Sequence, residues 1–114
     1  MYEYNAEIIS IVDGDSVKLN VDLGLSVHIH VAVRLTGLNA PELSTPAGKA
    51  AKAFVEATVA RLGSTVQVRT MKADKYGRYL AWVTWPGSTD LSLNQQLLSS
   101  GNAVPWDGKG QRPT

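Results

Sequence analysis

The chain has 114 residues, which is enough for one domain with a single hydrophobic core. Apolar residues make up 44% and charged residues 18%, the balance of an ordinary globular domain rather than of a disordered or fibrous chain. The absence of cysteine excludes disulfides, thiolate metal sites and a cysteine nucleophile, and the net charge of +1 does not by itself indicate a nucleic-acid partner.

The N-terminal segment "MYEYNAEIIS" contains an acidic residue and lacks the long apolar core of a secretory leader. No apolar run is long enough to span a membrane. We therefore expect a cytoplasmic protein that does not associate with membranes, although secretion is compatible with the sequence if a leader precedes residue 1. The sequence leaves the oligomeric state open.

The first third of the chain predicts three strands. Residues 4–12 are β-branched and apolar, "DGDS" at 13–16 forms a tight turn in which Gly14 can take a positive φ, and residues 17–21 return as a second strand. Residues 26–36 alternate between two faces. The apolar face carries Val27, Ile29, Val31, Val33 and Leu35, and the other face carries His28, His30, Ala32 and Arg34.

A helix is predicted over residues 46–62, where the period changes from two to that of an α-helix. Thr45 is a suitable N-cap, Pro46 suits the first helical position, and Gly63 ends the helix. Lysine and glutamate face outward on the expected helix. Its expected buried stripe consists of Ala47, Ala51, Phe54, Val55, Thr58 and Leu62.

Two strands at about 65–70 and 79–85 follow, and a short helix runs from about 91 to 100. The residues from 105 to 114 are rich in glycine and proline and are expected to form a loose tail beyond a domain of residues 1–104. This order predicts a mainly β protein with helices, an α+β fold built on a five-stranded OB-type barrel with one inserted helix and a short C-terminal helix. An open α+β sheet is the alternative.

Polar residues that suit phosphate or metal chemistry follow three of the predicted strands. Taken singly they have ordinary explanations, because "DGDS" is typical turn chemistry, an arginine can lie across apolar surface, and a basic loop is usually solvated. Folding would have to bring the three groups together. They are Asp13 and Asp15, then Arg34, Asn39 and Glu42, and finally Lys75, Tyr76 and Arg78.

Together these segments resemble the staphylococcal-nuclease-like (thermonuclease) family. The resemblance rests on "VDGDSVKL", "RLTGLNAPE" and "ADKYGRYLA" in this order, with a helix between the second and third, and on "LNQQLLSSGNA". It covers about residues 6 to 104. It implies an OB-type barrel and a calcium-dependent nuclease, an endonuclease that hydrolyses phosphodiester bonds of DNA and/or RNA, prefers single strands and leaves 3′-phosphate ends.

The resemblance also implies roles for particular residues. Asp15 matches a calcium-binding aspartate, Asn39 stands where the best-known members have a second one, and Ala40 replaces a threonine whose main-chain carbonyl binds the ion. The implied catalytic residues are Arg34 and Arg78, which hold the scissile phosphate, and Glu42, which orients or deprotonates the attacking water. The implied substrate-binding residues are Lys75, Tyr76 and, just past the second helix, Trp106.

The residue types suit this chemistry, because arginine holds two phosphate oxygens at once and a carboxylate can accept a proton from water. Asn39 keeps an oxygen donor but removes a negative charge, which predicts a weakened calcium site rather than an inactive one. The competing hypotheses are a catalytically weakened OB module that only binds single-stranded nucleic acid, and a structural or partner-binding domain.

Two further sets of residues have weaker functional interpretations. His28 and His30 share a strand face and could form half of a transition-metal site, but a surface or substrate-contacting position is the alternative. Trp82 and Trp85 could stack on bases, whereas packing against the barrel is the more ordinary expectation.

Overall fold

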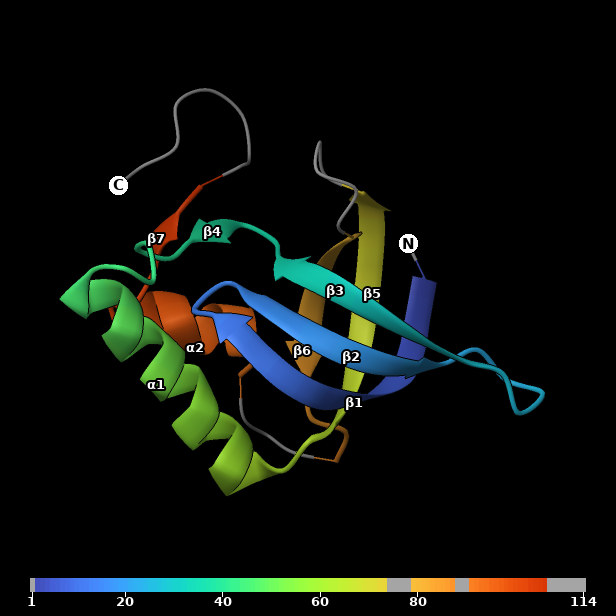
Figure 1. Ribbon diagram of the computed structural model, residues 1–114. Helices are drawn as coiled ribbons and strands as arrows, with labels where there is room; N and C mark the ends of the chain where they lie inside the picture. Colours follow the sequence, from blue (N-terminus) through green and yellow to red (C-terminus); the bar gives the residue numbers. More distant parts are fainter. Residues whose placement is uncertain (1, 74–78, 88–90, 107–114) are drawn as a thin grey trace.

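The computed structural model describes residues 2–73, 79–87 and 91–106. In this part of the chain, five strands close into a barrel in the order β1–β2–β3–β6–β5, and two helices lie together at one side of it (Figure 1). The predicted barrel is confirmed, and the open-sheet alternative is wrong. The elements are β1 (Tyr2–Asp13), β2 (Ser16–Asp22), β3 (His28–Leu35), β4 (Leu38–Asn39), α1 (Pro46–Leu62), β5 (Thr65–Ala73), β6 (Tyr79–Thr84), α2 (Leu93–Ser99) and β7 (Val104–Pro105).

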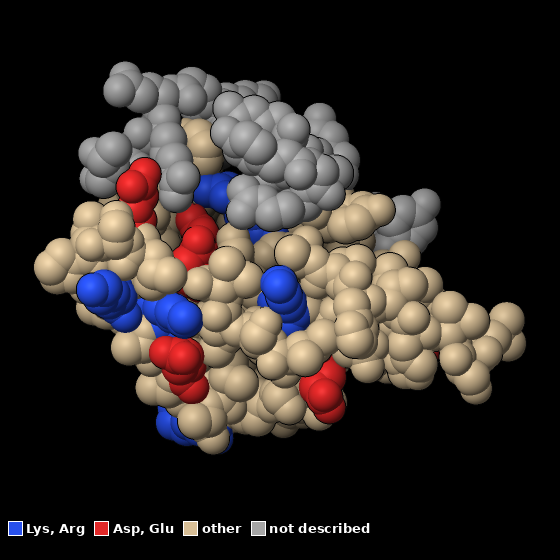
Figure 2. Space-filling model, in the orientation of Figure 1, with Lys and Arg blue, Asp and Glu red and all other residues tan. Residues whose placement is uncertain are grey.

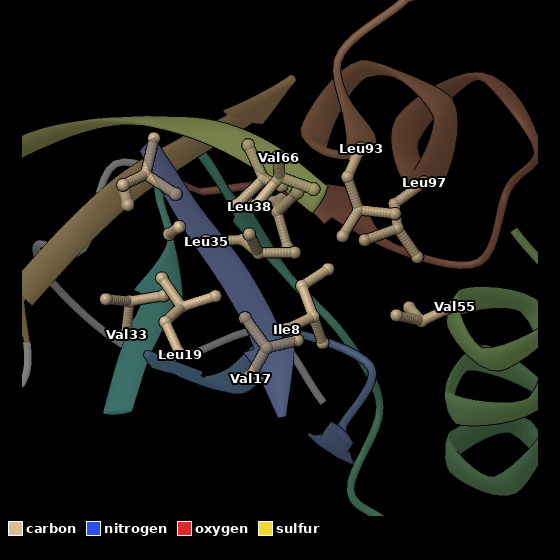
Figure 3. Packing of buried hydrophobic residues seen from close by; sticks show 14 of the residues in the cluster. Ile8, Val17, Leu19, Val33, Leu35, Leu38, Val55, Val66, Leu93 and Leu97 are labelled. Atoms are coloured by element: carbon tan, nitrogen blue, oxygen red, sulfur yellow. The ribbon is translucent and has the colours of Figure 1, made fainter. Parts of the chain in front are cut away.

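Alternation of side chains along the strands fills the barrel. On β2, Val17 and Leu19 are buried while Lys18 between them is exposed, as a period of two requires. Figure 3 shows the inward side chains of the strands meeting leucines of α2 and Val55 of α1. The core is therefore continuous from the barrel interior to the two helices.

The expected apolar face of β3 is only partly buried. Val33 and Leu35 are buried, but Val27 and Ile29 are 49% and 40% exposed. Val27 lies in the turn before β3, where its backbone bonds to Leu23 and Gly24. Ile29 lines an apolar cavity of about 450 Å³ together with residues such as Tyr79. The strand pattern correctly gives the side to which a residue points, but only closure of the barrel decides how deep it lies.

Helix α1 has the predicted bounds and caps. Its buried residues are Gly48, Ala51, Val55 and Thr58, spaced three or four apart as one helical face requires. The predicted stripe is wrong at Ala47, which is exposed, and it omitted Gly48. At the start of the helix, the buried face therefore begins one residue later than the predicted stripe, at Gly48 instead of Ala47.

Two short strands were not predicted. β4 pairs antiparallel with β7, with Leu38 opposite Pro105 and Asn39 opposite Val104. The backbone N–H of Trp106 continues this pairing by donating to the carbonyl of Gly37 at 3.1 Å. The predicted domain boundary after residue 104 stays a prediction, but Pro105 and Trp106 are joined to the segment that follows β3.

Helix α2 is held to the barrel by Asn94, which is 3% exposed. Its side-chain oxygen accepts from the N–H of Val83 at 3.1 Å, and its amide nitrogen donates to the carbonyls of Thr36 and Ala81, both at 3.0 Å. The bonds to Val83 and Ala81 are buried, so there the amide replaces the water that these backbone groups would otherwise need. Asn94 thereby links α2 to the end of β3 and to β6. Neither helix of the described chain is long and apolar enough to cross a bilayer.

Candidate active site

The turn between β1 and β2 places one carboxylate inside the protein. Asp15 is 3% exposed, and its N–H donates to Oδ1 of Asp13 at 3.0 Å, which closes the turn. The residue between them, Gly14, is free to take a positive φ, but it is not among the residues that do. A Cβ on Gly14 would lie 2.7 Å from Cβ of Ala51 and 2.9 Å from Cβ of Ala40. Glycine is therefore needed here for space, because the turn packs against α1 and residue 40.

The buried carboxylate of Asp15 is bound from three directions. Its Oδ2 accepts from the N–H of Ala40 at 3.1 Å and lies 3.6 Å from Nη2 of Arg34, while its Oδ1 is 3.4 Å from the donating hydroxyl of Ser16. The strand register explains the closeness of the arginine, because Ser16 pairs with Arg34 across β2 and β3. Three separate segments therefore meet at this one side chain.

Arg34 itself is 7% exposed and surrounded by acceptors. Its Nη2 donates to the carbonyl of Leu38 at 3.2 Å and to Oδ1 of Asn39 at 3.3 Å. The ring of Trp106 covers the guanidinium, with the Arg34 Cζ 4.8 Å from the ring centroid, a favourable cation–π geometry. Arg34 is thus held by polar contacts and a ring, rather than lying across apolar surface.

The pKa of Asp15 is raised from 3.8 to about 6, and burial is the largest cause. The side-chain hydrogen bond and the negative charge of Asp13 also raise it, whereas the N–H of Ala40 and the charge of Arg34 lower it. Burial and a neighbouring carboxylate both disfavour the charged form, which is why they act together. A cation bound between the two carboxylates would relieve this repulsion.

This raised pKa predicts a pH dependence of stability in the absence of metal. The folded state holds the proton of Asp15 more tightly than the unfolded state, so stability is lost as the pH rises from 3.8 through about 6. Between about pH 4 and about pH 7, the wild-type free energy of unfolding should therefore fall by about 2–3 kcal/mol more than that of Asp15→Asn. Urea unfolding of both proteins in a chelator checks this. Parallel pH profiles would contradict the assignment.

The predicted site residues fall into three groups in the structure. Asp15, Arg34, Asn39, Ala40 and Trp106 come together through the contacts above. Glu42 is exposed two residues after Ala40, and its backbone carbonyl is bonded to Thr45. Lys75, Tyr76 and Arg78 lie outside the described residues. Figure 2 shows acidic and basic side chains side by side at the end of the molecule where Figure 1 places β4 and β7.

The oxygen atoms at this site suit a hard divalent cation. Carboxylates of Asp13 and Asp15, the Asn39 side-chain oxygen and main-chain carbonyls are the donor types that calcium takes. Within residues 2–73, 79–87 and 91–106, no three His, Cys, Asp or Glu side chains gather in a way that could hold a metal. A histidine metal site finds no support, since His28 and His30 are exposed outside any such cluster.

Trp85 follows the more ordinary expectation of packing, and the expectation for Trp82 stays a prediction. Trp85 is 6% exposed and donates through Nε1 to the carbonyl of Gly63 at 2.8 Å, which ties β6 to the end of α1. Trp82 is partly buried on β6. Trp85 is thus part of the packing, and among the described tryptophans Trp106 is the one that contacts Arg34.

Sequence reasoning missed the residues that hold the segment after β4 against α1. Thr45 was predicted only as a helix cap and Gly48 was not singled out, yet both contact Glu42. A signal was present, because glycine inside a helix costs about 1 kcal/mol relative to alanine and therefore calls for a reason such as close packing.

A family model described as "Staphylococcal nuclease homologue" matches residues 32–112, which excludes the turn with Asp15 but includes the other predicted site residues. Two curated relatives are both named "Uncharacterized endonuclease", one from Escherichia coli O157:H7 and one from Escherichia coli. Each is 27% identical to this chain over 105 residues, which is 92% of this chain. The chain spans only 63% of the length of these relatives. A rice protein named "Probable staphylococcal-like nuclease CAN2" is 27% identical over 81 residues, 71% of this chain and 21% of the rice protein.

Proposed function

The chain belongs to the staphylococcal nuclease homologue family, and on that premise we propose that it is a calcium-dependent nuclease that cuts DNA or RNA internally and leaves 3′-phosphate ends. The observation that carries the proposal is the meeting of Asp15 and Asn39 at the guanidinium of Arg34, with the N–H of Ala40 bound to the same Asp15 carboxylate. Anion-binding and cation-binding groups side by side are what hydrolysis of an anionic diester needs.

Arg34 is the proposed holder of the scissile phosphate. Its contacts to Leu38, Asn39 and Asp15 measure 3.2, 3.3 and 3.6 Å. Charge-assisted hydrogen bonds between guanidinium and an anion are typically about 2.7–2.9 Å. A phosphate that approached at the shorter distance would make stronger hydrogen bonds to the guanidinium than these contacts do. The position of Trp106 over the guanidinium would then place a stacked base beside the bound phosphate.

Calcium is the proposed cofactor, held by the Asp15 carboxylate, the Asn39 side-chain oxygen and the Ala40 carbonyl. When bound, it would supply positive charge to the diester oxygens as negative charge grows on them. Asn39 contributes a neutral oxygen, so the affinity expected for such a charge-poor site is on the order of 10⁻⁴–10⁻³ M. The negative charge of Asp13 beside Asp15, which after burial contributes to the raised pKa of Asp15, supports a cation at this position.

Glu42 is the proposed general base. Its side chain is exposed, so solvent reaches it, and it follows the Asn39–Ala40 segment by two residues. It would orient and deprotonate the water that attacks phosphorus. Arg78 is proposed as the second phosphate-binding arginine. Lys75 and Tyr76 are proposed to bind the neighbouring phosphate and sugar. Single strands are the proposed preferred substrate.

One observation favours a second function. Arg34 and Asp15 form a buried ion pair, and such a pair can neutralise the site without any metal. This arrangement suits a catalytically weakened OB-type module that binds single-stranded nucleic acid.

Digestion of plasmid DNA and of RNA, with calcium titrated to the millimolar range, tests the proposal. We expect nicked and then linear plasmid, full loss of activity in a chelator, and product ends that carry a 3′-phosphate. If the folded protein cleaves neither substrate at any calcium concentration, the nuclease proposal is wrong. Binding of a labelled single-stranded oligonucleotide under those conditions would then establish the second function, and its salt dependence would confirm phosphate contact.

A further inference from the structure

We propose that Thr45 and Gly48, at the start of α1, are positioning residues that set the location of Glu42 relative to Asp15. This inference rests on the proposed nuclease function, in which Glu42 acts on water. Glu42 is exposed and follows an irregular segment, so its side chain depends on contacts of its own backbone for a defined position. In the part of the chain that the structure describes, Thr45 at the N-cap of α1 binds this backbone and Gly48 in the first turn lies close to it.

Thr45 binds the peptide of Glu42 twice. Its N–H donates to the Glu42 carbonyl at 2.9 Å, and its hydroxyl donates to the same oxygen at 2.6 Å. The hydroxyl also accepts from the N–H of Gly48 at 3.0 Å, which is the ordinary helix-capping contact. The Thr45 hydroxyl therefore links the first turn of the helix directly to the residue proposed as the base.

Gly48 lets the helix approach that peptide without a side chain between them. A Cβ on Gly48 would fall 1.8 Å from the Glu42 oxygen, 2.4 Å from its carbonyl carbon and 2.9 Å from Cα of Leu43. All three atoms belong to the backbone, so no side-chain rotation could make room. Capping alone does not explain this glycine, because alanine is the better helix former. Close packing against Glu42 does.

The same helix also contacts the turn that carries Asp15. A Cβ added to Gly14 would lie 2.7 Å from Cβ of Ala51, so α1 packs directly against Gly14. Gly14 immediately precedes Asp15. Ala51 follows Gly48 by three residues and is on the same helical face. One rigid turn of helix thus touches the Glu42 peptide through Gly48 and the Asp15 turn through Ala51. The separation of the proposed base from the proposed metal ligand is set by this turn.

Gly48→Ala is the test. The added Cβ must push the Glu42 backbone away by roughly 1 Å, and a displacement of this size at a reacting group costs about 10²-fold in rate. We expect kcat to fall about 10²-fold with KM nearly unchanged, because the phosphate-binding Arg34 on β3 is not touched. The substrate is a fluorescent single-stranded oligonucleotide at saturating calcium.

Gly63→Ala is the matched control at the other end of α1. Gly63 has φ of 96°, so alanine strains the helix, but nothing lies within 4 Å of its added Cβ. Both variants should lower the thermal midpoint of unfolding, but only Gly48→Ala should lower kcat. Equal kcat values in the two folded variants would overturn the positioning role.

Thr45 gives a second test should Gly48→Ala fail to fold. Thr45→Ala should lower kcat, and Thr45→Ser, which keeps the hydroxyl, should restore it. Wild-type kcat in folded Thr45→Ala would also overturn the inference. These outcomes are separate from failure of the proposed function, which an inactive wild-type protein would reveal before any variant is compared.

Discussion

Glu42→Gln is expected to reduce kcat by about 10²–10⁴-fold, the usual contribution of a general base. The amide has the same shape as the carboxylate but cannot accept a proton from water, so substrate binding should be retained. Measurement of kcat and KM on a single-stranded oligonucleotide, with affinity measured separately in a chelator, tests both parts. Glu56→Gln is the matched control, because Glu56 is another exposed glutamate, on α1.

The outcome separates the two candidate functions. A variant that binds like wild type but no longer cleaves supports the enzyme, with Glu42 in the chemical step. If Glu42→Gln keeps the wild-type kcat, Glu42 is not the general base. The proposal that Thr45 and Gly48 position a catalytic Glu42 would then also be wrong. Glu56→Gln must keep full activity for either conclusion to hold.

Arg34→Lys is expected to reduce kcat/KM by about 10²–10³-fold, the effect of removing one preorganised donor to a developing charge. Lysine keeps the positive charge but has no planar fork to hold two phosphate oxygens and stacks poorly beneath a ring such as that of Trp106. It also cannot reproduce the contacts to Leu38 and Asn39. Steady-state kinetics at saturating calcium measures the loss.

Arg69→Lys is the matched control for this change. Arg69 is about half exposed and pairs with Glu3 at 2.8 Å on the barrel surface, so its replacement should leave kcat/KM unchanged. Thermal unfolding of both variants shows how much of any effect is structural, because Arg34 is also part of a buried ion pair. Full activity in folded Arg34→Lys would show that charge alone suffices and would contradict two-oxygen binding at Arg34.

Local sequence patterns determined most of the secondary structure. Period-two alternation predicted the long strands, and the cap, first-turn proline and terminal glycine predicted the 46–62 helix with its observed bounds. These signals are short-range, so they can be read from neighbouring residues. The resemblance of spaced motifs then predicted that Asp15 and Arg34 would share one site, and the structure places their side chains 3.6 Å apart.

Only the tertiary structure decided how these residues contact one another. The β4–β7 pairing joins segments more than 60 residues apart, and no local pattern reports a partner that distant. Burial under several segments raises the pKa of Asp15, which depends on how much water the fold removes. Glycine at positions 14 and 48 is needed for close packing against residues distant from the turn or helix that carries it, and that requirement exists only after helix α1 is placed. Periodicity determines the direction in which a side chain points, whereas its depth, partners and charge state follow from the closed barrel and the helix packed against it.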